Sequence, residues 1–176
     1  MGFTPLEGLI MGTRCGDLDP GVIFHVMHAE ELDERQITTL LNKHSGLYGI
    51  SGESNDMREL LAAEAKGNAR AKLAVDMFCY RLKKYIAAYA GVMGGVDAVL
   101  FTGGIGENAP QVRERSLAGL EFMGIALDPV RNAATVGREG DISAEGSRVR
   151  VLVIPTNEEL IIARDTVRLV TGTPQV

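Results

Sequence analysis

The spacing of apolar residues along the chain predicts more helix than strand. Helical periodicity begins after Asp19-Pro20, where an aspartate precedes a proline at the first helical position, and again after Asp33. A glycine–serine loop is expected at 45–54 and a short helix near 55–65. The longest helix is predicted over 68–93. Its apolar stripe, which predicts core positions, consists of Leu73, Met77, Phe78, Leu82, Tyr85, Ile86 and Tyr89.

Two short apolar runs, 96–102 and 149–155, predict buried strands. Helical patterns follow them at about 109–122 and 156–170, and the stretch 128–147 between them is polar and irregular. Strands that alternate with helices indicate an α/β fold. Because two strands make a poor sheet, we expect further strands from an upstream segment or another chain.

Composition narrows the class of partner. The chain has 176 residues, of which 45% are hydrophobic, and this suits one domain with a substantial core. A net charge of −5 and a pI near 5.2 argue against nucleic acid or an anionic membrane as the main partner. Cys15 and Cys79 lack metal or disulfide spacing, and the first residues lack a signal-peptide pattern, so we expect a cytoplasmic protein with two free thiols.

The stretch "GGIGENA" fits the dinucleotide-binding pattern at Gly104, Gly106 and Ala109. Glycines between a strand and a helix let a ligand approach the backbone closely, although a tight turn alone also uses them. An NAD-binding Rossmann fold requires Asp128 on a strand beside this turn. About a hundred residues precede the motif and a polar stretch follows it, and both features argue against that fold.

Three further stretches, in predicted loops or at the starts of predicted helices, carry polar residues that could bind a ligand. Thr156 and Glu159 in "IPTNEEL" fit a capping box, which leaves Glu158 available to bind Mg²⁺. Asp56 in "SNDMREL" either stabilises the first turn of a helix or accepts hydrogen bonds from the hydroxyls of a ribose. Arg58 either stacks on a base or is solvated. Arg14, among the glycines of "GTRCGD", suits a carboxylate or phosphate.

Taken in order, these stretches resemble the acetate kinase family. The resemblance spans nearly the whole chain and rests on "MGFTPLEGLIMGTRCGDLDP", "SGESNDMREL", "VLFTGGIGENAPQVRE" and "VIPTNEELIIARD". It implies an α/β fold, the C-terminal part of an actin-like or sugar-kinase-like (ribonuclease H-like) ATPase domain whose sheet is incomplete without upstream strands. It also implies that "FTGGIGEN" is an adenosine-binding turn.

The resemblance implies transfer of the ATP γ-phosphoryl group to acetate or a similar short carboxylate, and the reverse reaction, with Mg²⁺. Arg14 matches the family's active-site arginine, and Glu158 matches its Mg²⁺-associated glutamate. The nucleotide-binding positions implied by the resemblance are Asp56, Met57, Arg58, Gly104, Ile105, Gly106, Glu107 and Asn108. Phosphoryl transfer mainly requires positioning and neutralisation of negative charge, which an arginine and a metal supply.

The resemblance also implies a division of the chain. Residues 1–157 match the C-terminal part of a second, nucleotide-binding domain, and residues 158–176 match a final helix that packs on a first domain. Because family members carry further catalytic groups upstream, we expect this chain alone to be inactive. Without the first domain, the apolar face with Leu160, Ile161 and Leu169 is expected to be exposed or covered by a partner. The alternative is a non-catalytic nucleotide-binding or assembly module. The family resemblance also implies that the full-length protein assembles as a homodimer.

Overall fold

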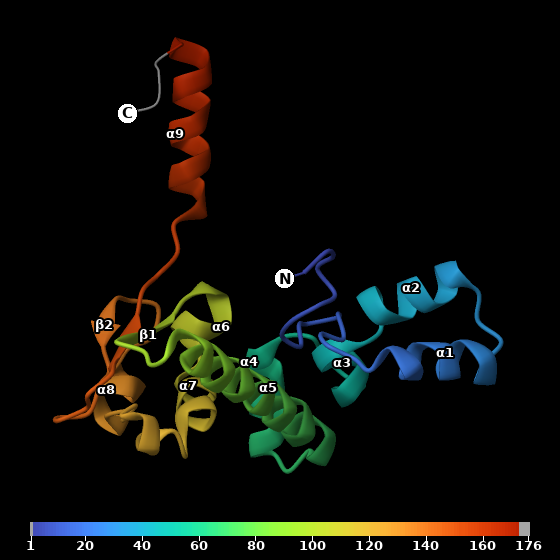
Figure 1. The fold of residues 1–176 in the computed structure, drawn as a ribbon, viewed down its shortest axis with the longest axis horizontal. Coiled ribbons are helices and arrows are strands. Elements are labelled where there is room, and N and C mark those ends of the chain that lie inside the picture. The colour runs from blue at the N-terminus through green and yellow to red at the C-terminus, as the bar shows by residue number, and fades with distance from the viewer. Residues whose placement is uncertain (1, 173–176) are drawn as a thin grey trace.

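The computed structural model describes residues 2–172, apart from the side chain of Glu158. Helices predominate, and a small sheet lies at one end of the body (Figure 1). The helices are α1 (Pro20–Ala29), α2 (Glu34–Lys43), α3 (Gly46–Ser51), α4 (Met57–Ala65), α5 (Ala69–Met93), α6 (Gly103–Asn108), α7 (Pro110–Leu117), α8 (Pro129–Ala134) and α9 (Glu158–Thr171), with a 3-10 turn at Glu121–Met123. The strands are β1 (Ala98–Phe101), β2 (Gly140–Asp141) and β3 (Arg150–Val153).

The helix starts predicted from aspartates are confirmed. The Asp19 carboxylate accepts a hydrogen bond from the Gly21 amide at 2.8 Å at the start of α1. At the start of α2, Asp33 accepts from the Gln36 amide, and the Gln36 side chain in turn accepts from the Asp33 amide, both at 2.8 Å. Such reciprocal caps satisfy amides that have no partner within the helix.

The loop predicted at 45–54 is wrong in part, because residues 46–51 form α3. Gly46 lies at φ 63°, and a Cβ at this position would lie 2.2 Å from the Met11 carbonyl oxygen. The amides of Leu47 and Tyr48 donate to the carbonyls of Met11 and Gly12, both at 2.9 Å. The N-terminus of α3 is therefore capped by backbone groups of the first loop, a long-range arrangement that local composition does not indicate.

The buried face of α5 also differs from the predicted stripe. Leu73, Met77 and Tyr89 are exposed, whereas Phe78 is buried as predicted. The other buried positions are mostly small: Ala71, Ala74, Val75, Cys79 and Ala90. Small residues let α5 lie close to α3, α4 and α7, which it contacts. Of the predicted stripe, Leu82 and Ile86 are partly buried against the core.

The sheet has the strand order β1-β3-β2, with β3 in the centre. β1 pairs in parallel with β3, and β2 pairs with β3 in antiparallel orientation. The two predicted strands are confirmed in shorter form. β3 is buried as predicted at Val151 and Val153, whereas β1 buries only Phe101 and exposes Leu100, so the predicted burial of 96–102 is wrong in part. Within residues 2–172 the sheet has three strands, and β1 forms one edge.

Two apolar clusters, which lie side by side, form the core. The first joins α3, α4, α5 and α7, and the second joins the strands with Leu117, Leu120 and Ile125. Leu82 of α5 packs against both clusters. Both cysteines are free, and Cys79 is buried in the first cluster. Among the helices described, none is long and apolar enough to cross a membrane.

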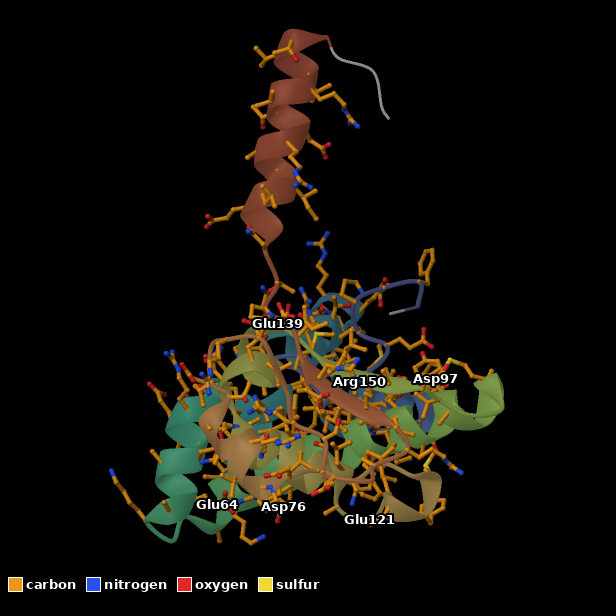
Figure 2. All side chains as sticks on the ribbon, turned by 90° about the vertical axis from the view of Figure 1, so that its left-hand side faces the viewer. Glu64, Asp76, Asp97, Glu121, Glu139 and Arg150 are labelled. Atoms are coloured by element: carbon orange, nitrogen blue, oxygen red, sulfur yellow. The ribbon has the colours of Figure 1, made fainter. Side chains whose placement is uncertain are left out.

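Helix α9 stands away from the rest of the molecule (Figures 1 and 2). The predicted exposure of Leu160, Ile161 and Leu169 is confirmed, at 42%, 62% and 78% of their surface. The side chains of α9 project from the helix on all sides without reaching the body (Figure 2). The packing of this helix on a further domain stays a prediction.

Candidate nucleotide-binding site

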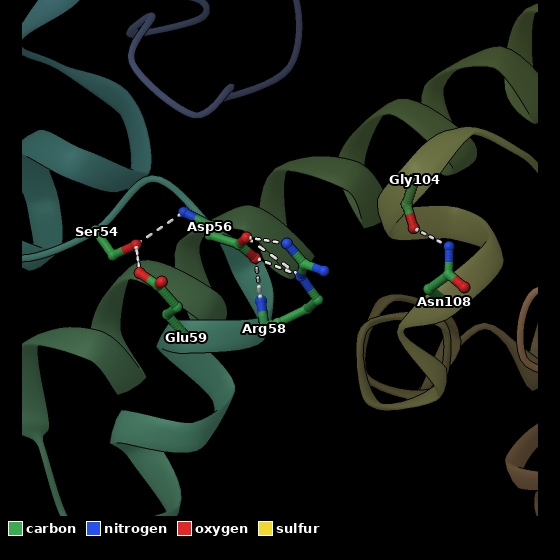
Figure 3. A network of polar contacts seen from close by, with 6 residues as sticks. All are labelled: Ser54, Asp56, Arg58, Glu59, Gly104 and Asn108. Carbon is green, nitrogen blue, oxygen red and sulfur yellow. Dashed lines mark hydrogen bonds and ion pairs between the residues drawn. The ribbon is translucent and has the colours of Figure 1, made fainter.

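A cleft of about 690 Å³ lies between the start of α4 and helix α6. It brings together two stretches that are far apart in the sequence, "SNDMR" and "GGIGEN". Its lining consists of Asn55, Asp56, Met57, Arg58, Leu61, Gly104, Ile105, Asn108, Ala109 and Val136. Six of the eight predicted nucleotide-binding residues therefore line one cleft, and Gly106 and Glu107 do not. Figure 3 shows the two walls facing each other.

The α4 wall is built around the carboxylate of Asp56. This group caps α4 by accepting from the Arg58 amide at 2.8 Å, and it pairs with the Arg58 guanidinium at 2.5 Å. The Arg58 side-chain and amide hydrogen bonds lower the pKa of Asp56 to about 2, so the carboxylate is ionised at neutral pH. Both partners lie at the surface, where such a pair contributes little stability and rearranges readily.

The segment before α4 is braced by hydroxyl groups that the sequence analysis missed. The Ser54 hydroxyl donates to Glu59 at 2.5 Å and accepts from the Asp56 amide at 3.0 Å (Figure 3). The Ser51 hydroxyl accepts from the amides of Glu53 and Ser54, both at 3.2 Å. Met57 is buried in the first core cluster and attaches the same segment to the core.

The α6 wall is a short helix that follows β1 directly. Gly103 starts it at φ 72°, in the left-handed region that favours glycine. A Cβ on Gly104 would meet nothing within 4 Å, so this position leaves its backbone open to the cleft. A Cβ on Gly106 would lie 3.3 Å from the backbone of Phe101, so this glycine serves helix–strand packing. The Asn108 side chain donates to the Gly104 carbonyl at 2.9 Å.

A fully buried arginine, Arg113 of α7, supports the α6 wall from behind. Its guanidinium donates to the carbonyls of Gly106 and Glu107 at 2.7 and 3.1 Å. It also donates to the carbonyls of Asn132 and Thr135, at 2.9 and 2.6 Å, and to the Asn132 side chain at 2.8 Å.

These acceptors lie at the C-terminal ends of α6 and α8, where helix dipoles favour a cation. Burial lowers the pKa of Arg113, as expected for a cation removed from water. This residue could not be found from the sequence, because an arginine in a helical pattern ordinarily indicates a solvated face. The hydrogen bonds make it the main support of the α6 wall.

Glu107 contacts protein groups rather than the cleft. Its Oε1 accepts from the Gly103 amide at 2.8 Å, the Thr156 amide at 2.9 Å and the Thr156 hydroxyl at 3.1 Å. These bonds, with that of the Thr156 amide foremost, lower the pKa of Glu107. The carboxylate thus joins the α6 wall to the junction between β3 and α9.

Arg14 lies half-buried in the first loop, outside the lining of the cleft. The loop reaches the α4 wall at Gly12, where a Cβ would lie 3.3 Å from the Asn55 Cβ. Asp17 ties the loop to α5, since it accepts from the Tyr85 hydroxyl at 2.6 Å and from the Arg81 guanidinium at 3.1 Å.

The Tyr85 hydrogen bond is the largest cause that lowers the pKa of Asp17, and the same bond raises the pKa of Tyr85 to about 12. The carboxylate is therefore ionised and the phenol neutral over the whole physiological range. The loop that carries Arg14 is thus anchored at Gly12 on one side and at Asp17 on the other.

Comparison with known proteins identifies the family. The sequence model of the acetokinase family matches residues 1–164. The chain belongs to the acetokinase family. It is 57% identical over 173 residues to the acetate kinase of Heliobacterium modesticaldum, a match that covers 98% of this chain and 43% of the relative. The chain therefore spans less than half the length of the curated relatives it matches.

Solved structures of the acetokinase family have the same fold. The crystal structure of Porphyromonas gingivalis acetate kinase matches with a TM-score of 0.91 and 50% identity, over 97% of this chain and 43% of that one. A propionate kinase from Francisella tularensis matches with a TM-score of 0.86 and 43% identity, over 93% of this chain and 41% of that one. The predicted α/β class and the family resemblance are confirmed.

The proposed metal ligand of this acetokinase-family chain, Glu158, is the first residue of α9, and its side chain lies outside the described residues. The capping box predicted at Thr156 and Glu159 is wrong, because Asn157 caps α9 by accepting from the Leu160 amide at 3.0 Å. The Thr156 hydroxyl donates to Glu107 instead. Among the described side chains, which do not include that of Glu158, no group of three or more His, Cys, Asp or Glu residues could hold a metal ion. Mg²⁺ often uses one or two carboxylates with water and phosphate oxygens, so a single glutamate fits it.

The alternative Rossmann interpretation of the glycine turn is wrong. Asp128 lies on no strand but caps α8, where it accepts from the amides of Val130 and Arg131 at 2.8 and 2.9 Å. Its carboxylate is therefore used within its own helix, away from the lining of the cleft.

Proposed function

We propose that this chain forms the nucleotide-binding part of an acetate kinase-type phosphotransferase. Such an enzyme transfers the γ-phosphoryl group of ATP to acetate or a similar short carboxylate, and catalyses the reverse reaction. The observation that carries the proposal is the cleft itself, in which Asp56 and Arg58 face Gly104 and Asn108. The names of the relatives, acetate kinase and propionate kinase, support a short carboxylate as the acceptor.

In this proposal the two walls of the cleft hold the nucleoside. The Asp56 carboxylate accepts the ribose hydroxyls, and the Arg58 guanidinium, released from its ion pair, lies against the base. The open backbone at Gly104 and Ile105 allows the adenosine and the α-phosphate to approach. Gly106 and Glu107 shape the turn without contacting the nucleotide.

Arg14 and Glu158 act on the reacting groups in this proposal. The Arg14 guanidinium neutralises the substrate carboxylate or the phosphoryl group in transfer, and the half-buried loop restricts its motion. Glu158 would hold Mg²⁺, which offsets the negative charge of the phosphates when it is bound. Location in the cytoplasm and assembly as a homodimer belong to the same proposal.

Calorimetric titration with ADP tests the nucleotide site of the chain. We expect saturable binding to one site, and Arg14→Ala should leave it unchanged because Arg14 lies outside the cleft lining. Absence of ADP binding to the wild-type chain would contradict the proposal.

Hydroxamate detection of acetyl phosphate tests the reaction. The chain alone should give no product, whereas the chain mixed with the upstream part of a related acetate kinase should give product that Arg14→Ala strongly reduces. If the chain binds ADP but gives no product either alone or in the mixture, the non-catalytic nucleotide-binding module would be favoured. Equal turnover with and without Arg14 would remove this residue from its proposed role.

A further inference from the structure

Glu107 makes hydrogen bonds through both its backbone and its side chain. Its carbonyl oxygen accepts from the Arg113 guanidinium and from the Gly137 amide, each at 3.1 Å. Its carboxylate oxygen Oε1 accepts from Gly103 and twice from Thr156. The backbone of Glu107 is thus fixed to the buried support of the α6 wall, while its side chain reaches across to another segment.

The segment it reaches lies immediately before α9. Thr156 is separated from the first residue of α9 by Asn157 alone. Within the described residues, the apolar side chains of α9 are exposed and the helix stands clear of the body, so packing inside this chain does not set its direction (Figure 1). The direction of α9 therefore depends on the junction, and Glu107 holds the junction through two hydrogen bonds to Thr156.

The other end of this connection lies at the cleft. Gly104, Ile105 and Asn108 line the cleft, and they belong to the same six-residue helix as Glu107. Because Glu107 and these cleft residues share one short helix, a ligand that shifts this helix would also shift Oε1. Hydrogen bonds weaken steeply beyond about 3.2 Å, so even a small displacement changes the attachment of Thr156.

We propose that Glu107 is a positioning residue that couples occupancy of the nucleotide cleft to the direction of α9. The inference rests on the proposed nucleotide site. By linkage, if nucleotide binding changes the α9 junction, then holding α9 in one direction changes the affinity of the cleft for the nucleotide. Because α9 begins with the proposed metal ligand, the same connection sets where Glu158 stands relative to a bound nucleotide.

Amide hydrogen exchange over residues 154–162 tests the coupling in the intact chain. Four proteins are compared with and without saturating ADP: wild type, Glu107→Gln, Glu107→Ala and Glu114→Ala. Glutamine keeps an acceptor at Oε1, so it should retain a weaker attachment, whereas alanine removes it. Glu114 is an exposed carboxylate on the neighbouring α7 and serves as the matched control.

Without ADP, the Thr156 amide should exchange about tenfold faster in Glu107→Ala than in wild type, with Glu107→Gln between them. ADP should change exchange over 154–162 in wild type, less in Glu107→Gln and not at all in Glu107→Ala. The Glu114→Ala chain should behave as wild type. A role confined to capping α6 would leave 154–162 unchanged in every chain, and this result would overturn the coupling.

The same measurements separate this inference from the proposed function. If wild type does not bind ADP, the proposed function fails, and the ligand-free comparison alone then decides whether Glu107 holds the junction. If ADP binds to Glu107→Ala and still changes exchange over 154–162, the nucleotide site stands and the coupling is overturned. Thr156→Val, which loses only the 3.1 Å hydroxyl bond, should give a smaller increase in exchange than Glu107→Ala.

Discussion

The two walls of the cleft are held in opposite ways. On the α4 wall, Asp56 and Arg58 pair with each other at the surface, where water competes for both. On the α6 wall, Arg113 is buried and makes its bonds to carbonyl oxygens without a carboxylate partner. One wall thus presents polar groups that can exchange partners, and the other presents a backbone that a buried cation supports from behind. Both kinds of wall serve the proposed function, in which the cleft binds and releases a nucleotide.

The largest expected effect is loss of the buried support. Arg113→Met should destabilise the chain by about 3 kcal/mol, because it removes the five hydrogen bonds that the buried guanidinium donates to α6, to Asn132 and to Thr135. Urea unfolding measures this, with Arg58→Ala as the matched control on the other wall. The control should stay within about 0.5 kcal/mol of wild type. Equal destabilisation by the two variants would break the contrast between the walls.

The second effect falls on binding rather than stability. Asp56→Asn should keep a cap on α4 and cost little stability, since asparagine is as good a cap as aspartate. It should weaken ADP binding by about tenfold, because the charged acceptor for the ribose hydroxyls is lost. Calorimetric titration measures the affinity. Unchanged affinity would show that the ribose does not reach this carboxylate.

A third, smaller effect distinguishes the open glycine of the α6 wall. Gly104 and Gly91 both lie in helices with no atom within 4 Å of an added Cβ. Each Gly→Ala change should therefore stabilise the chain slightly, by about 0.5 kcal/mol. Only Gly104→Ala should weaken ADP binding, by a few-fold, since Gly91 lies outside the cleft lining. Equal affinities for the two variants would place the nucleotide elsewhere.

The smallest effect concerns pH. The pKa of Asp56 is lowered from 3.8 to about 2 in the folded chain, so its contribution to stability is complete above about pH 4 and is lost as the pH falls toward 2. The difference in Tm between wild type and Asp56→Ala should therefore shrink over that interval. Thermal melts at several pH values measure it. A difference that grows as the pH falls would contradict the assigned direction.

The two stretches that form the walls of the cleft could be found in the sequence, because each is a local motif, and their role in nucleotide binding stays a prediction. Asp56 and Gly104 were identified because caps and glycine turns depend on local chemistry, which a single stretch displays. Arg113 was missed because its importance comes from carbonyls of α6 and α8, which only the fold brings together. The same reason explains α3, whose cap is a backbone loop more than thirty positions upstream.

The packing face of α5 could not be read from hydrophobicity alone. Leucine and methionine indicate a core face by periodicity, yet the helix buries Ala71 and Ala74 and exposes Leu73. Close approach of neighbouring helices favours small side chains, and periodicity does not report the distance between axes. The position of Arg14 relative to the cleft likewise depends on Asp17 and Tyr85, which lie 68 residues apart.

The free-standing α9 also has a thermodynamic consequence. Among the described residues, α9 exposes its apolar side chains, and an isolated helix of 14 residues is only marginally stable in water. Its ellipticity at 222 nm should then respond to whatever covers it, and the body should stay unchanged. A partner that binds and stabilises α9 should therefore increase the helicity of the chain, and circular dichroism can measure this increase without a label.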